Sequence, residues 1–234
     1  MILGMELYNK IVDYMKKPFG VGRNLIVGGL GLVTAASLAS TDVKSNQGLA
    51  QLLKPLPAAA QETTLAQRIE QTEAEVKTKP TAESYVKLSD LYFKANKTEE
   101  AGNAAREAIK LDQKNFNAYN NLGLYFILTK PPQFDKAKEM LEQSISLNDK
   151  NAYAYNTMAF LFYKQKQYKQ AIGYATIAIR HDPRLAPSYD IMGACYYYLG
   201  YYPKARAAFL QALRIDPNLE SSKKWLQFLD SKGV

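Results

Sequence analysis

Residues 82 to 218 repeat one pattern with a period of 34 residues, and this period constrains the fold more than any other feature of the chain. The segment 186–218 can be laid over 152–184 without gaps. Two earlier copies begin at residues 116 and 82, and the copy at 116 aligns once two extra residues, Pro131 and Pro132, are allowed. One such unit cannot bury its apolar face alone, so the period predicts stacked units with a shared core. Residues one period apart in the last two copies are Tyr155 and Tyr189, Met158 and Met192, Ala171 and Ala205, Ala178 and Ala212, and Pro183 and Pro217.

The residues at fixed places in each copy resemble those of the tetratricopeptide repeat family. In that family the first helix carries an aromatic residue, then a large aliphatic, a small residue and a second aromatic. The second helix carries small residues around a bulky one, and a proline closes the unit. The first two copies depart from the pattern because Gln113 and Asp149 replace the closing proline. The last copy supplies Tyr189, Met192, Gly193, Tyr196, Ala205, Phe209, Ala212 and Pro217.

The resemblance implies an all-α fold, a tetratricopeptide-repeat superhelix of about four helix pairs with a concave face lined by the first helix of each pair. The repeats are expected at residues 82–115, 116–151, 152–185 and 186–218. Solenoids need their apolar ends covered. Residues 62–81 are therefore expected to form an N-terminal helix, and residues 219–234, with Trp225, a C-terminal capping helix.

Residues 1–41 are predicted to be a membrane anchor or a signal segment, because residues 25–41 contain 17 residues without a charge and follow Lys16, Lys17 and Arg23. Three interpretations remain open: an uncleaved anchor, a cleaved signal peptide, and a hydrophobic helix buried in a protein partner. The first two place the repeats on the far side of the membrane, in the cell envelope, the periplasm or outside the cell, whereas a cytosol-facing organelle membrane needs the opposite topology. Residues 42–61, with Pro55 and Pro57, read as a linker. The apolar residues of the predicted membrane segment are Leu25, Ile26, Val27, Leu30, Leu32, Val33 and Leu38.

The sequence contains no recognisable catalytic or cofactor motif. Neither a phosphate-binding GxxxxGK[ST] loop nor an HExxH or GxSxG motif occurs, and the chain has one cysteine, Cys195, and one histidine, His181. These two residues cannot form a disulfide or a Cys/His zinc cluster by themselves. Cys195 is expected to be a small buried residue, and His181 to sit at a helix C-terminus, where a cation is favourable. We therefore expect no enzyme activity, cofactor or metal site.

Ten residues are the candidates for binding a partner, because the resemblance directs their columns on the first helices toward the groove. Asparagines donate and accept hydrogen bonds together, which suits the backbone of an extended peptide, and tyrosines add rigid contact area. Family members that bind the acidic tails of chaperones use lysines and arginines on this face, where only Lys164 is near, so that ligand is not expected. The candidates are Asn117, Asn120, Leu124, Ile127, Tyr153, Asn156, Phe160, Tyr163, Asp190 and Tyr197.

The function expected from these features is a non-enzymatic protein–protein interaction scaffold that is anchored to a membrane or exported and binds a protein or extended peptide in its groove. The alternatives are a self-assembling structural subunit of an extracellular or envelope filament or complex, and a receptor on an organelle surface. Homo-oligomerisation stays open because 11 of the 17 tyrosines lie between residues 152 and 218, more than the repeat requires. The net charge of +8, from 30 Lys and Arg against 22 Asp and Glu, permits polyanion binding, but no RNA-binding module accompanies it and nucleic acid is not expected.

Overall fold

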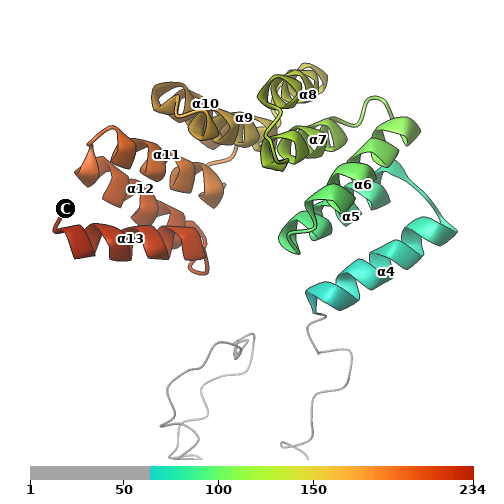
Figure 1. The fold of residues 1–234 in the computed structure, drawn as a ribbon, viewed down its shortest axis with the longest axis horizontal. Helices are drawn as coiled ribbons and strands as arrows, with labels where there is room; N and C mark the ends of the chain where they lie inside the picture. Colours follow the sequence, from blue (N-terminus) through green and yellow to red (C-terminus); the bar gives the residue numbers. More distant parts are fainter. Residues whose placement is uncertain (1–63) are drawn as a thin grey trace, which may run out of the picture. The chain divides into compact units, whose positions relative to one another are not determined.

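The computed structural model describes residues 64–234, and this part of the chain contains ten α-helices and no strand. Four helix pairs follow one N-terminal helix and precede one C-terminal helix, which confirms the all-α solenoid (Figure 1). The expected membrane segment, the linker and the two residues before Thr64 lie outside the described residues. Within residues 64–234, no helix is both long enough and apolar enough to cross a membrane. The helices are α4 (Leu65–Thr78), α5 (Ala82–Lys94), α6 (Thr98–Leu111), α7 (Phe116–Leu128), α8 (Phe134–Leu147), α9 (Ala152–Lys164), α10 (Tyr168–His181), α11 (Ala186–Tyr198), α12 (Tyr202–Ile215) and α13 (Glu220–Lys232).

The described helices form a curved array in which the first helices lie on the inner side. Each helix contacts the next helix in the chain, and each of the first helices α5, α7 and α9 also contacts the first helix of the following pair. The second helices α6, α8, α10 and α12 make no such contact with one another. Closer approach on one side of a stack bends it toward that side, so the first helices line the concave face. The capping helix α13 continues this row because it contacts α11 as well as α12 (Figure 1).

Small residues allow the first and second helices of each pair to approach closely. A Cβ atom added to Gly193 would lie 2.7 Å from the ring of Phe209, which is fully buried on α12. A Cβ atom on Gly123 would lie 2.7 Å from Leu141 on α8. Alanine and serine fill the same place in the other two pairs, where Ala159 and Ser89 have no exposed surface. The interior of each pair is therefore packed too tightly for a larger side chain at this position.

The turns between consecutive pairs share one hydrogen bond that the repeat pattern did not predict. Asp112, Asn148, Asp182 and Asp216 each follow the last residue of a second helix. In every case the side-chain oxygen accepts a hydrogen bond from the backbone N–H two residues later, at 2.9 to 3.1 Å. This short turn holds the chain until the next helix begins, which is a first helix in three cases and the capping helix α13 in the fourth.

The two extra residues of the second repeat are confined to the loop between α7 and α8. In the other pairs the residue before the second helix donates its backbone N–H to a first-helix carbonyl five residues earlier, as from Lys97 to Tyr92 at 2.9 Å. In the second pair the same bond runs from Gln133 to Phe126, also at 2.9 Å, although seven residues separate the two. Pro131 and Pro132 thus lengthen the loop and leave the closure of the helix pair unchanged.

Candidate partner-binding surface

The ten candidate residues differ in how much surface they present on the concave face. Asn117 is exposed, and Tyr153 exposes 58% of its surface. Leu124, Phe160, Tyr163 and Tyr197 are half-buried. Their outer parts remain available to a partner.

One candidate is removed from this surface. Ile127 is only 1% exposed and packs in the same core cluster as Leu141, Met158 and Leu161. The next helix pair covers the side of α7 that carries it. Ile127 therefore contributes to folding and offers a partner no contact area.

Two of the polar candidates connect neighbouring inner helices. Asn156 on α9 accepts a hydrogen bond at 2.8 Å from the hydroxyl of Ser188 on α11. Asp190 on α11 accepts one at 2.5 Å from the hydroxyl of Ser222 on α13. Burial is the largest influence on the Asp190 carboxyl and raises its pKa, while hydrogen bonds from Ser222 and Ser221 act in the opposite direction. These two side chains hold neighbouring inner helices in register, a role that was not expected from the sequence.

Asn120 occupies the equivalent place on α7 and is buried, with 8% of its surface exposed. Its amide nitrogen donates to Asn121 at 3.3 Å, and Asn121 in turn donates to the carboxylate of Asp90 on α5 at 2.7 Å. The side-chain oxygen of Asn120 has no hydrogen-bond partner among the described residues. Asn120 is thus the start of a polar chain between α7 and α5.

A continuous row of aromatic rings runs along the inner helices of the C-terminal half, from α9 through α11 to α13. We call this row the ring surface. Its ring centroids are separated by 6.4 Å from Phe160 to Tyr163, 6.1 Å from Tyr163 to Tyr198 and 6.1 Å from Tyr198 to Trp225. Tyr197 and Phe228 complete it, at 5.1 Å and 5.9 Å from Trp225. The row therefore spans three helices that are up to 68 residues apart in sequence.

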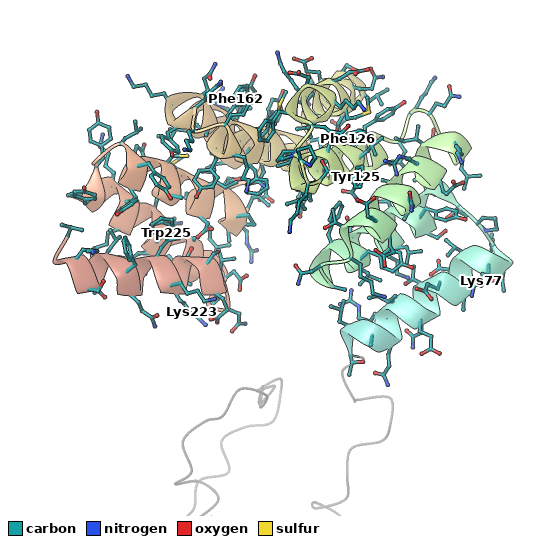
Figure 2. The ribbon with its side chains drawn as sticks, viewed as in Figure 1. Lys77, Tyr125, Phe126, Phe162, Lys223 and Trp225 are labelled. Atoms are coloured by element: carbon teal, nitrogen blue, oxygen red, sulfur yellow. The ribbon has the colours of Figure 1, made fainter. Side chains whose placement is uncertain are left out.

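Rings of the second helices α10 and α12 pack against the ring surface and hold it in place. Trp225 lies on the side of α13 that faces α11 and α12, where it stacks at 5.5 Å on the buried ring of Phe209 (Figure 2). Tyr198 stacks at 4.9 Å on Tyr168 of α10. Burial raises the pKa of the Tyr163 hydroxyl well above its ordinary value, and the neighbouring Tyr198 adds to the effect. These rings are fixed before any partner arrives, which reduces the entropy lost on binding.

The surface between α11 and α13 is hollowed, with a cavity volume of about 540 Å³. We call this cavity the C-terminal hollow. Tyr198 and Phe228 on its walls expose 50% and 37% of their surface. Its lining consists of Tyr197, Tyr198, Ser221, Lys224, Trp225 and Phe228.

Cys195 and His181 have structural surroundings. Cys195 is fully buried in the core of α11, and burial raises the pKa of its thiol to about 12. The thiol is therefore protonated at neutral pH and a poor nucleophile. His181 ends α10, where it is exposed and stacks on the ring of Tyr155 at 5.4 Å.

The sequence predicted Trp225 only as part of the capping helix, and neither Trp225 nor Phe228 was expected to take part in the groove. The sequence did contain one sign that they act together, because their spacing of three residues places both side chains on one face of a helix. The contact of this face with Tyr197 joins residues 28 or more positions apart and depends on how α13 docks.

Comparison with known proteins agrees with this architecture. Models of the tetratricopeptide repeat match residues 82–115 and 186–219. The chain is 29% identical to the BBSome complex member BBS4 of Bos taurus over 136 residues, which are 58% of this chain and 26% of that protein. It is 31% identical to Hsp70-Hsp90 organizing protein 1 of Glycine max over 90 residues, which are 38% of this chain and 16% of that protein. The matches thus span about a quarter or less of these two relatives.

Among solved structures, a thermophilic tetratricopeptide repeat protein of Thermus thermophilus is similar with a TM-score of 0.63. The two sequences are 13% identical, and the match covers 73% of this chain and 91% of the other. At this identity the likeness shows the fold alone.

Proposed function

Because this chain is a tetratricopeptide repeat protein, we propose that it is a non-enzymatic scaffold that binds an extended segment of a partner protein along its concave face. The observation that carries the proposal is the ring surface. Aromatic side chains are enriched at the energetic centres of protein interfaces, and here several of them lie partly exposed along one row of helices. If these aromatic side chains served only the hydrophobic core, neighbouring residues would cover them completely. One matched relative is by its name an organizing protein of Hsp70 and Hsp90, which supports a role in holding proteins together.

The structure changes which residues of the face are proposed to bind. Asn156 and Asp190 already serve neighbouring helices, so removing either would disturb the array as well as any binding. Asn117, Leu124, Tyr153, Phe160, Tyr163 and Tyr197 keep exposed surface and remain in the proposed site. We expect most of the binding energy to come from the aromatic residues among them.

The test begins with a selection of binding peptides from a displayed library on the purified full chain. Affinities of the selected peptides are then measured for the wild type and for a variant carrying Tyr153→Ala and Phe160→Ala. Loss of two aromatic contacts should weaken binding about tenfold or more, since each contact at an interface centre contributes about 1 to 2 kcal/mol.

A variant carrying Lys138→Ala and Glu142→Ala is the matched control. These two residues form an exposed ion pair of 3.6 Å on the second helix α8, away from the concave face. Exposed pairs of this kind contribute at most about 1 kcal/mol, so the fold should persist and binding should be unchanged. If the control variant loses affinity while the concave-face variant keeps it, the second helices recruit the partner and the proposal is wrong.

We also propose that residues 1–41 hold the scaffold at a membrane or direct its export. The proposal is supported by the uncharged run of 17 residues that follows Lys16, Lys17 and Arg23. Cells expressing the full chain or residues 62–234 would be fractionated. The full chain should enter the membrane or exported fraction and the shorter chain should not. Equal distribution of the two would contradict this role.

A further inference from the structure

We infer that the C-terminal hollow binds an acidic, proline-rich segment of a partner protein. The inference rests on the proposed function and specifies the chemistry of the partner at one end of the concave face. It follows from the shape of the aromatic walls, from the hydrogen-bonding groups of the lining and from the charge around it.

The walls of the hollow are rings set nearly at right angles. Tyr198 and Trp225 meet at 84°, Trp225 and Phe228 at 82°, and Tyr197 and Phe228 at 73°. Each of these contacts is edge-to-face, so the ring faces that point away from the neighbouring ring stay uncovered, and a flat apolar group can pack against the exposed parts of Tyr198 and Phe228. The pyrrolidine ring of proline is a small, rigid group of this kind.

The hydrogen-bonding groups of the hollow favour a ligand that offers acceptors. Neither a carboxylate nor an amide side chain lines it, and its Lys224 and Trp225 have only donors. Hydrogen bonds of α13 side chains within the described residues involve Glu220, Ser221, Ser222, Lys223, Asp230 and Ser231, and none uses the indole N–H of Trp225.

A proline-rich segment matches this lining. It adopts the polyproline II conformation, in which the carbonyl groups have no internal partner and proline itself has no N–H to satisfy. Such segments characteristically bind aromatic-lined grooves, and they lose little conformational entropy because they are already extended. An ordinary extended strand would bring backbone N–H groups that this lining leaves without a carboxylate or amide acceptor.

The charge around the hollow favours acidic residues beside the prolines. Within residues 64–234, Lys224 makes no ion pair, and the ammonium of Lys232 lies 5.7 Å from the ring of Phe228. Residues 152–234 carry 11 Lys and Arg against 5 Asp and Glu, whereas residues 64–111 carry 8 of each. The excess of +6 is thus a property of the end of the array that holds the hollow, and it attracts an acidic segment.

Trp225 is the only tryptophan of the chain, so its fluorescence reports on this hollow directly. The full chain would be titrated with a synthetic peptide of four Glu-Pro-Pro triplets. We expect a saturable change in Trp225 emission, with an affinity that falls as salt is added, because salt screens exposed charges. A peptide of four Lys-Pro-Pro triplets and one of four Glu-Gly-Ser triplets should each bind at least tenfold more weakly.

Two substitutions in the hollow have matched controls elsewhere. Tyr198→Ala should weaken the Glu-Pro-Pro peptide about tenfold, while Tyr201→Ala, which removes an equally exposed ring outside the hollow, should leave it unchanged. Lys224→Glu should weaken the same peptide about tenfold, and Lys169→Glu on α10 should not. Circular dichroism of each variant shows whether the fold is kept, and Lys224→Glu changes a charge without removing any ring.

The outcomes separate this inference from the proposed function. Equal binding of the Glu-Gly-Ser or the Lys-Pro-Pro peptide, or indifference to both hollow variants, would overturn the inference. Library peptides that depend on Phe160 and Tyr153 but not on Tyr198 would do the same and leave the proposed function intact. A synthetic peptide of residues 51–61 of this chain, which contains Pro55 and Pro57 beside Lys54, is the remaining occupant to test. If it bound more tightly than the Glu-Pro-Pro peptide, the hollow would hold this chain's own segment and the inference would be wrong.

Discussion

Single small residues decide how closely the helices of this array approach. Gly193 lies against the ring of Phe209, and that ring also stacks on Trp225. Gly102 on α6 is a similar position, because an added Cβ atom would overlap the ring of Tyr125. The repeat pattern does not mark this glycine. The absence of a side chain at position 193 on α11 therefore affects, through Phe209, how Trp225 lines the C-terminal hollow on α13.

Gly193→Ala should destabilise the C-terminal end of the array. The new methyl group would lie 2.7 Å from Phe209, and overpacking a buried site costs about 1 to 3 kcal/mol. Chemical denaturation measures the change in the free energy of unfolding. Hydrogen exchange should show lost protection in α11 to α13 and unchanged protection in α5 to α7, because each repeat contacts only its neighbours. Gly173→Ala is the control, because no atom lies within 4 Å of its added Cβ atom. It should stabilise by about 0.5 to 1 kcal/mol through helix propensity alone. Uniform loss of protection from residue 82 onward would instead mean a single cooperative unit.

Asp190→Asn should stabilise the protein at neutral pH. Burial raises the pKa of Asp190 above its ordinary value of 3.8, so the folded state disfavours the charged form that is present at pH 7. Asparagine keeps an oxygen to accept the hydrogen bond from Ser222 and has no charge to desolvate. The gain should shrink as the pH falls through the folded-state pKa toward 3.8, because wild-type Asp190 is then protonated in both states. Thermal midpoints of the two proteins between about pH 3 and pH 7 test this. A difference that grows on acidification would show that the ionised carboxylate stabilises the fold.

At the scale of elements, α13 has two roles. It closes the apolar end of the last repeat with Leu229, which is fully buried, and with the ion pair of Asp230 to Arg206 at 2.6 Å. It also presents Trp225 and Phe228 to the hollow. The two roles fall on different side chains of one helix and can be separated by substitution.

Leu229→Ala should cost about 2 to 5 kcal/mol of stability, since it leaves a cavity beneath α13. Phe228→Ala, which removes a ring that is already 37% exposed, should cost clearly less and should instead weaken peptide binding in the hollow. Urea unfolding followed by Trp225 emission measures both variants. Equal destabilisation by the two substitutions would mean that Phe228 belongs to the cap rather than to the binding surface.

At the scale of the whole molecule, the described residues 64–234 belong to one compact unit. The core clusters run from Ile69 on α4 to Leu229 on α13, so both ends of the array are covered by their own helices. A solenoid capped in this way should not need a further segment for its stability.

Residues 62–234 should therefore be soluble, helical and monomeric when produced alone. Far-ultraviolet circular dichroism measures the helix content, and size-exclusion chromatography with light scattering measures the mass. Aggregation with loss of the helical signal would show that residues 1–61 take part in folding. A well-folded oligomer would favour the self-assembling subunit over the scaffold.

The sequence by itself determined the helix pairs and their order. Aromatic, aliphatic and small residues recur at fixed places, and the local spacing of such residues sets which face of a helix is buried. The buried face of each helix depends only on contacts within one repeat, such as that of Gly193 with Phe209. The all-α fold could therefore be predicted from the sequence.

Only the tertiary structure decided which residues of the concave face are free to bind. Ile127 is covered and Asn156 is engaged by Ser188 because of residues contributed by other repeats. Likewise, Trp225 lines the hollow because α13 docks beside Tyr197 of α11. Contacts between repeats depend on the angle and distance at which whole helix pairs stack, and those arise from the sum of many side-chain packings that no local pattern in the chain specifies.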